Sequence, residues 1–173
     1  SSMKDVDQIT APGGAGELFL KARDQGKVKF LGVSAHSAEA ALALMDRFPL
    51  DSILFPVNFV CWEQGRFGPQ ILEKAKSKGI ARLALKAMAH TKWETGAVKK
   101  YKYCWYKPVD DPLKAREAVR FTLSQDITAA VPPGHDSLFE MAMGAAANFQ
   151  PLTAKESRAL LATAAGVEPI FRA

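Results

Sequence analysis

The chain has 173 residues, of which 48% are hydrophobic and 24% are charged. This composition is typical of a soluble globular protein and argues against a disordered or collagen-like chain. A complete eight-stranded β/α barrel is disfavoured, because it usually takes about 250 residues. The net charge of +5 favours an anionic ligand, such as a phosphate-bearing cofactor.

Other classes of partner have little support in the sequence. No dense basic run or RNA-binding signature is present, so we expect no nucleic-acid partner, and residues 99–103, where lysines alternate with tyrosines, read more simply as a solvated loop. No apolar run is long enough to cross a membrane, and no segment resembles a signal peptide. Cys61 and Cys104 lack the spacing of a disulfide framework or a metal motif. These features predict a cytoplasmic protein with reduced thiols.

Strands and helices are predicted to alternate along most of the chain. In order, we expect a loop over residues 4–14, a helix over 16–25, a strand over 28–34, a helix over 38–47, a strand over 52–55, a helix over 69–79 and a strand over 80–85. A loop over 86–110, a helix over 111–124, a strand over 127–131 and a helix over 137–147 follow. A capping box at Thr153 and Glu156 starts a further helix to about residue 165. Short apolar strands without strict alternation indicate a parallel sheet covered on both faces, and we expect one α/β domain over residues 1–173.

Ligands of parallel α/β folds bind where the strands end at their carboxyl side. The candidate residues there are Ser34, Ala35, His36, Pro56, Asn58, Lys86, Met88, His90, Pro133, Gly134 and His135. Gly134 leads into a helix whose first amides could bind an anion, although a plain strand-to-helix turn has the same pattern. Lys86 could bind phosphate, form a Schiff base if burial lowers its pKa, or point to solvent.

The sequence offers little support for acid–base, metal or Rossmann-type cofactor sites. His36 and His90 are candidate acid–base groups, but neither has an Asp neighbour in sequence, which favours structural or exposed roles. The three histidines do not have metal-ligand spacing, so we expect no metal site. No G-x-G-x-x-G motif is present, so a nicotinamide cofactor would need a binding mode other than the Rossmann one.

Several of these segments resemble aldo-keto reductases when taken in order. Residues 26–34, GKVKFLGVS, resemble the GK-x-R-x-[IL]-GVS segment of the fifth barrel strand of that family. Residues 71–80 and 83–89 are similar to its sixth helix and seventh strand, and residues 119–134 resemble its ALR[WF]-x-L…VT-x-x-IPG signature. The resemblance spans about residues 13–150. It implies strands five to eight, a parallel (β/α)4 half of a TIM-type (β/α)8 barrel with an extra C-terminal helix.

The resemblance also implies an NADP(H) site. Ser34 matches a residue that contacts the nicotinamide carboxamide, although Ala35 stands where the family commonly has Asn. The loop with Lys86, Ala87 and Met88 corresponds to the path of the cofactor pyrophosphate. The residues that correspond to the adenosine-phosphate loop are Pro133, Gly134 and His135.

The catalytic Asp, Tyr, Lys and His of the family lie on the first four strands, so no catalytic residue is assigned here. We therefore expect the cofactor-binding half of an NADP-dependent enzyme that reduces aldehydes or ketones, inactive by itself. The alternative is a non-catalytic half-barrel that acts in interaction or assembly. Because four βα units leave two sheet edges exposed, we expect a homo-oligomer or a complementary N-terminal half as partner. A lyase that uses Lys86 is a third reading.

Overall fold

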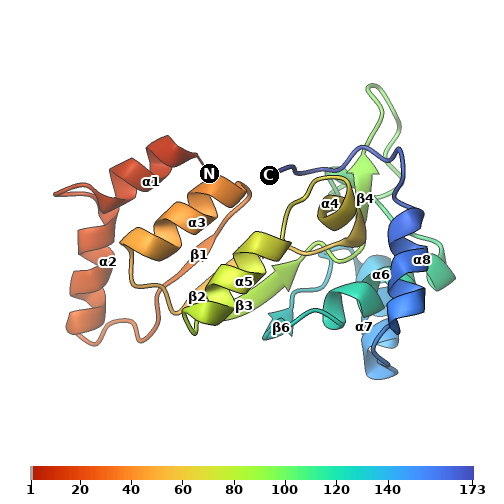
Figure 1. Cartoon of the computed structure of the whole chain (residues 1–173). Coiled ribbons are helices and arrows are strands. Elements are labelled where there is room, and N and C mark those ends of the chain that lie inside the picture. The colour runs from red at the N-terminus through yellow and green to blue at the C-terminus, as the bar shows by residue number, and fades with distance from the viewer. Residues whose placement is uncertain (1) are drawn as a thin grey trace.

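The computed structural model describes residues 2–173. Its centre is a parallel sheet of four strands in the order β1-β2-β3-β6 (Figure 1). The strands are β1 (Gly32–Ser34), β2 (Ser52–Pro56), β3 (Ala81–Leu85) and β6 (Ala129–Ala130). Each strand lies beside its predecessor in this sheet, as consecutive βα units require. The predicted parallel (β/α)4 architecture is confirmed.

The helices lie close to their predicted positions. Those between and after the strands are α3 (Ala38–Arg47), α4 (Phe59–Glu63), α5 (Pro69–Ser77), α6 (Pro112–Leu123) and α7 (Asp136–Ala147), and α8 (Ala154–Ala162) is the predicted extra C-terminal helix. Thr153 and Glu156 form the predicted capping box at the start of α8. The short helix α4 was not predicted, and it is capped by the side chain of Asn58. No helix described for residues 2–173 has the length and apolar character needed to cross a membrane.

The prediction of a loop over residues 4–14 is wrong. Residues Met3–Thr10 form helix α1, which is followed by α2 (Ala15–Asp24). Ser2 and Asp5 form a capping box at the start of α1, and Val6 is buried with Ala40 and Leu44 of α3. Packing against α3 stabilises a segment whose short sequence pattern did not indicate a helix.

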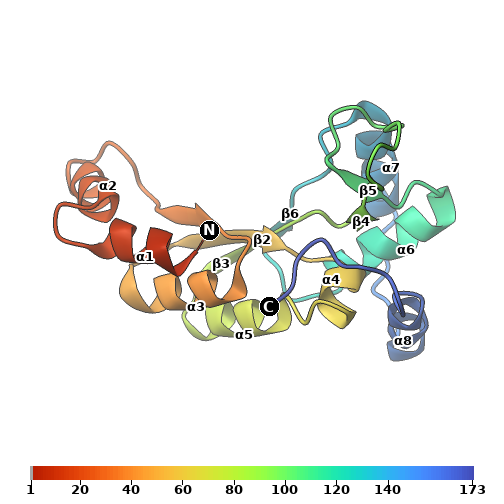
Figure 2. The same cartoon turned by 90° about the horizontal axis from the view of Figure 1, so that it is seen from above.

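The prediction of a loop over residues 86–110 is also wrong. This segment contains an antiparallel ribbon of β4 (Ala89–Lys92) and β5 (Tyr106–Pro108), which lies apart from the main sheet (Figure 2). The indole Nε1 of Trp93 donates a hydrogen bond of 2.8 Å to the carbonyl oxygen of Cys104. The ribbon and this bond hold together a connection that the sequence showed only as a long polar and aromatic stretch.

The outer strands β1 and β6 are shorter than predicted. The prediction placed them over residues 28–34 and 127–131, whereas three and two residues are in strand conformation. Each has only one neighbouring strand, β2 or β3, so hydrogen bonding is available on one side only. Both therefore present an open edge.

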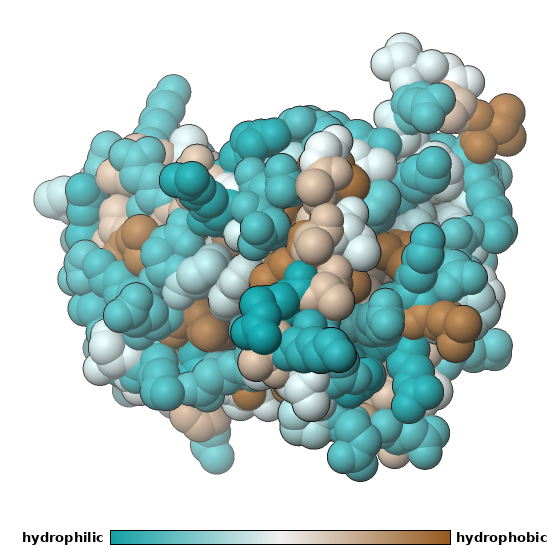
Figure 3. All heavy atoms as spheres, turned by 45° about the vertical axis from the view of Figure 1, so that its right-hand side comes forward, coloured by the Kyte–Doolittle hydropathy of each residue, from teal (hydrophilic) through white to brown (hydrophobic). Residues whose placement is uncertain are grey.

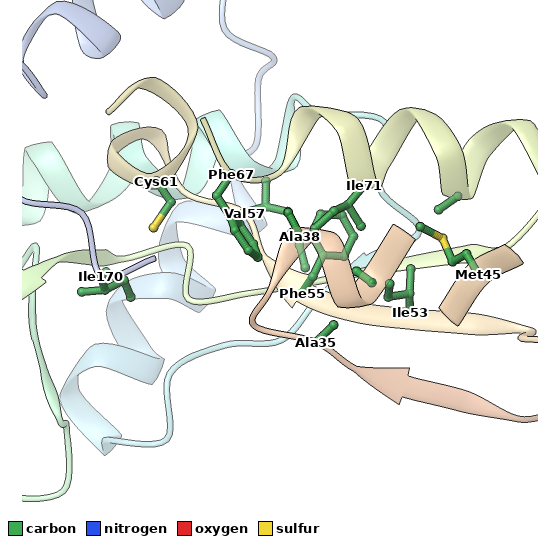
Figure 4. Close-up of a cluster of buried hydrophobic side chains, with 14 of the residues drawn as sticks. Ala35, Ala38, Met45, Ile53, Phe55, Val57, Cys61, Phe67, Ile71 and Ile170 are labelled. Carbon is green, nitrogen blue, oxygen red and sulfur yellow. The ribbon is translucent and has the colours of Figure 1, made fainter. Parts of the chain in front are cut away.

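One face of the sheet carries the core. Helices α3 and α5 lie on this face (Figures 1 and 2). Ile53 and Phe55 point toward the helices and are fully buried, and they pack with residues of α3 and α5 such as Ala38 and Ile71 (Figure 4). Register with Phe55 places Ala84 on the same face, and it is also fully buried.

The opposite face is bare. Ser34, Leu54 and Leu83 are paired with one another across β1, β2 and β3, and their side chains are on this face. Leu85, two residues after Leu83 in β3, is on the same face. The three leucines are only partly buried, and Val131, after β6, is 44% exposed. No helix of residues 2–173 covers this face (Figure 2). The expectation of a sheet covered on both faces is therefore wrong for this chain, because α3 and α5 cover one face and no described helix covers the other.

The side of the molecule that carries the β4–β5 ribbon and α8 is different in character. It is mostly hydrophilic, with apolar side chains in small and separate patches (Figure 3). Scattered apolar residues of this kind are normal on a solvated surface. The bare face of the sheet is thus the surface of this chain that most lacks a covering layer.

Candidate functional site

A pocket of about 330 Å³ lies at the carboxyl ends of β3 and β6. Three segments line it, namely residues 85–86 at the end of β3, residues 103–106 at the start of β5, and residues 131–135 with 138 after β6. Four of the predicted site residues, Lys86, Pro133, Gly134 and His135, are brought together here from segments that are far apart in the sequence. Leu85 and Val131 also line the pocket, which therefore adjoins the bare face of the sheet.

Lys86 is the cation of this pocket. Its backbone φ of 64° lies in the left-handed region, which is uncommon for a residue other than glycine. The side chain is half-buried, and its Nζ lies 5.3 Å from the ring centroid of Trp105 and 5.6 Å from that of Tyr106. Burial lowers the pKa of Lys86, and the two ring faces favour its charged form. Among residues 2–173, no carboxylate forms an ion pair with this ammonium, so its charge is available to an anion.

The opposite wall is the turn that leads into α7. His135 is the N-cap residue of this helix, and its side chain makes no capping hydrogen bond to the first amides. The positive end of the helix therefore faces the pocket, although Asp136 in the first turn offsets part of that potential. Gly134 leaves room here, since a Cβ added to it would meet no atom within 4 Å. This wall suits the close approach of an anionic group.

The two walls are in contact with each other. The ring of Tyr101 meets the ring of His135 edge to face, with 4.9 Å between the centroids. The Tyr101 hydroxyl donates a hydrogen bond of 3.0 Å to Asp110, which also pairs with Lys100. This chain of contacts fixes the loop between β4 and β5 against the start of α7.

The other predicted cofactor residues lie outside the pocket. Ser34 is exposed at the end of β1 and lines a separate groove beside α1 and α3. Strand β1 is three strand spacings, or roughly 14 Å, from β6. Ser34 points to the same bare face as Leu85, so the pocket and Ser34 lie along one edge of the sheet. Ala87 and Met88 are buried and pack with Val119 and its neighbours in a hydrophobic cluster. Their side chains support the loop and do not line the pocket.

The aromatic part of the pocket was missed by sequence reasoning. Tyr103, Trp105 and Tyr106 form one side of it. The only signal for them was the concentration of aromatic residues within the segment 86–110. Burial raises the pKa of Cys104 and of Tyr106, so both side chains stay protonated near neutral pH.

The two histidines proposed as acid–base groups are not part of this pocket. The ring of His36 packs on Phe171 at 5.0 Å, and that of His90 on Phe59 at 6.2 Å. Burial is the main cause that lowers the pKa of each histidine, and neighbouring lysines add to the effect. Both are therefore neutral imidazoles packed on aromatic rings. The pocket itself combines a cation, a helix N-terminus and aromatic faces, which suits an anionic ligand that carries a planar ring.

The sequence matches no protein-family model, and it matches no curated protein. The fold, in contrast, is similar to solved structures of aldo-keto reductases. The holo form of the aldo-keto reductase AKR11C1 from Bacillus halodurans has a TM-score of 0.56 at 16% identity, over 86% of this chain and 54% of that chain. The apo form has a TM-score of 0.55 at 16% identity, over 86% of this chain and 55% of that chain.

A third structure agrees with these two. The glycerol dehydrogenase AKR11B4 from Gluconobacter oxydans has a TM-score of 0.54 at 20% identity, over 96% of this chain and 58% of that chain. The fold of the chain is therefore similar to half of an aldo-keto reductase barrel, and the chain spans about half the length of the structures it matches. The expected half-barrel is confirmed at the level of the fold.

Proposed function

We propose that the chain is the cofactor-binding half of an NADP-dependent aldo-keto reductase, acts in the cytoplasm and is inactive by itself. The main observation behind this proposal is the pocket at the carboxyl ends of two adjacent strands. It is lined by Lys86 on one side and by the turn of Pro133, Gly134 and His135 on the other. In parallel β/α folds this is the edge where ligands bind. The similarity of the fold to aldo-keto reductases supports the same assignment.

The residues of the pocket fit part of such a cofactor. The Lys86 ammonium and the first amides of α7 suit phosphate oxygens, and the ring of Trp105 suits a planar base. A pocket of about 330 Å³ is small for a whole dinucleotide, so we infer that it takes the phosphate-bearing part. Ser34, further along the same edge, would then contact the nicotinamide carboxamide.

The proposed inactivity follows from which half of the barrel this chain resembles. When bound, the reduced nicotinamide supplies a hydride to a carbonyl carbon, and the carbonyl oxygen needs a proton donor. In the aldo-keto reductases that the sequence resembles, the catalytic Asp, Tyr, Lys and His lie on the first four strands, which are not in the half of the barrel that this chain matches. The proton donor would therefore come from the complementary half of the barrel.

Titration of the chain with NADPH tests this proposal. We expect wild-type protein to bind NADPH and Lys86→Met to bind it about 10- to 100-fold more weakly, the range of one charge-assisted hydrogen bond. Lys27→Met is the control, because Lys27 is an exposed lysine that does not line the pocket. Failure of the wild-type chain to bind NADPH would contradict the proposal. Oxidation of NADPH with an aldehyde by this chain alone would contradict the proposed inactivity.

Gly134 provides a second and independent test. A Cβ at Gly134 meets no atom of the chain, so Gly134→Val should leave thermal stability nearly unchanged. Its side chain would occupy the space that the ligand needs, and NADPH affinity should fall. Gly144→Val is the control, since Gly144 of α7 is equally open and lies outside the pocket. Equal NADPH affinity in both variants would place the ligand elsewhere.

A second candidate function is non-catalytic assembly, which the bare face of the sheet favours. Parallel sheets are normally buried on both faces, yet Leu54, Leu83 and Leu85 lie on a face without a covering layer. We propose a second copy of the chain as the occupant in this case. A two-fold axis parallel to the strands would place β1 of one copy beside β6 of the other, in parallel, and close both open edges.

Light scattering separates the two candidates. The assembly proposal predicts a dimer of the purified chain, whereas the cofactor-half proposal predicts that a complementary N-terminal half covers the same face. A stable monomer at high protein concentration would contradict the assembly proposal. The NADPH titration is unaffected by that result and still decides the first proposal.

A further inference from the structure

The C-terminal tail after α8 runs back over the carboxyl ends of the strands (Figure 1). Two hydrogen bonds hold its end on the loop between α4 and α5, one of 2.9 Å from the Ala173 amide to the Gly65 carbonyl and one of 3.1 Å from the Arg172 guanidinium to the Gln64 carbonyl. Its beginning is held by the Thr91 hydroxyl, which donates to the Glu168 carbonyl at 2.8 Å. The tail is thus fixed at both ends.

The fit of the tail on this loop is close. A Cβ at Gly65 would lie 2.3 Å from the carbonyl oxygen of Phe171, which leaves no space for any side chain at this position. Ile170 of the tail is buried in the main core, in the same cluster as Cys61 and Phe67 (Figure 4). The tail is therefore a packed part of the fold.

Phe171 of the tail joins three loops. Its ring lies 5.0 Å from His36 after β1, 5.9 Å from Phe67 after β2 and 5.8 Å from Trp105 of the loop after β3, measured between ring centroids. These are distances at which aromatic pairs attract one another. One side chain thus links the loops that follow three consecutive strands, at the edge where the pocket lies.

Trp105 connects this cluster to the pocket. It is 48% exposed, so little else encloses it, and its ring meets Phe171, the neighbouring Tyr106 at 5.3 Å and the Nζ of Lys86. Among residues 2–173, Phe171 is the one ring partner that comes from outside the segment of Trp105. Loss of the Phe171 ring would leave the indole held mainly by its sequence neighbour.

We propose that Phe171 is a positioning residue, whose ring holds Trp105 in place and thereby fixes the wall of the pocket beside Lys86. The proposal rests on the proposed function only where it predicts cofactor affinity. The position of Trp105 itself can be observed without any cofactor. The C-terminal tail, which carries none of the predicted site residues, thus prepares the site for its ligand.

The indole N–H resonances of the three tryptophans test the position of Trp105 in the ligand-free chain. Trp105→Phe identifies the resonance of Trp105. We expect Phe171→Ala to shift and broaden this resonance, and to leave that of Trp93 nearly unchanged because its N–H is hydrogen-bonded to Cys104. Phe171→Tyr keeps the ring and should restore the wild-type spectrum.

NADPH affinity is the second readout. Loss of one aromatic pair should weaken binding by about 2- to 10-fold in Phe171→Ala, with recovery in Phe171→Tyr. Phe19→Ala is the matched control, because Phe19 is 54% exposed on α2, far from the pocket in the sequence and outside its lining. If Phe171→Ala does not fold, Phe171→Leu keeps the apolar volume and removes only the ring.

The outcomes separate this inference from the proposed function. A wild-type chain that does not bind NADPH contradicts the proposed function, while the tryptophan spectrum still decides whether Phe171 positions Trp105. An unchanged Trp105 resonance in folded Phe171→Ala or Phe171→Leu would overturn the inference. A shifted resonance with unchanged NADPH affinity would overturn the link between Trp105 and the ligand.

Discussion

Two adjacent residues of β2 allow a direct test of the bare face. Ile53 is fully buried under α3 and α5, whereas Leu54, the next residue of the strand, is partly buried on the opposite face (Figure 4). Ile53→Ala should lower the free energy of unfolding by roughly 2–5 kcal/mol, because it removes buried apolar groups and leaves a cavity. Leu54→Ala loses only part of the burial energy of a leucine, about 1 kcal/mol, since a complete side chain contributes roughly 1.5–3 kcal/mol.

The assay is urea denaturation followed by circular dichroism, at low and at high protein concentration. For a monomer, the difference between the two variants in the lost free energy of unfolding should be the same at both protein concentrations. If a second copy covers the bare face, the loss in Leu54→Ala should grow with protein concentration, because the side chain becomes fully buried in the dimer. The Ile53→Ala loss should stay nearly constant and serves as the control.

Equal losses for the two variants at low concentration, in a sample shown to be monomeric by light scattering, would refute the reasoning. Such a result would mean that Leu54 is as buried as Ile53 within a single chain. The face would then be covered by residues of the chain itself, and neither a second copy nor a complementary half would be needed there.

Three further predictions concern contacts that support the site. Thr122→Val should lower the free energy of unfolding by about 1–3 kcal/mol in a urea titration, because the buried hydroxyl donates a hydrogen bond of 2.7 Å to the Val57 carbonyl. Hydrogen bonds from Thr153, together with Arg120, hold the pKa of Glu156 at about 2, so its stabilisation is complete above pH 4.5 and is lost as the pH falls toward 2. Glu156→Gln should therefore flatten this part of the acid-denaturation curve. Gly65→Ala should displace the C-terminal tail, seen as faster hydrogen exchange of its amides, because the new Cβ would lie 2.3 Å from a backbone oxygen.

Each of these has a control. Thr122→Ser keeps the hydroxyl and should retain more stability than Thr122→Val, and the reverse order would contradict the role of the hydrogen bond. Lys155→Gln, on the same turn of α8, should leave the acid-denaturation curve nearly unchanged, and an equal effect of both variants would contradict the assignment to Glu156. Gly144→Ala, at an open position, should leave the tail amides unaffected.

The sequence alone predicted the four strands of the main sheet with the helices α3, α5, α6, α7 and α8, and it predicted the edge of the sheet where the pocket lies. The capping box of Thr153 and Glu156 and the apolar strands are local signals, and the structure confirms them. Helix α1 and the β4–β5 ribbon were missed, because they are stabilised by partners distant in sequence, as Val6 is by Ala40. A local pattern carries no information about such partners.

Tertiary structure alone decided which candidates share a site. It brought Lys86 next to Gly134, because β3 and β6 are neighbours in the sheet, and it placed Ser34 two strands away from β3. It also added Trp105 and, through the tail, Phe171, neither of which has a sequence motif. Local sequence indicates where a strand ends and a loop begins. Which loops then lie side by side depends on how the strands and helices pack together. The bare face arises in the same way, since only the assembled sheet shows that α3 and α5 cover one of its faces and no helix covers the other.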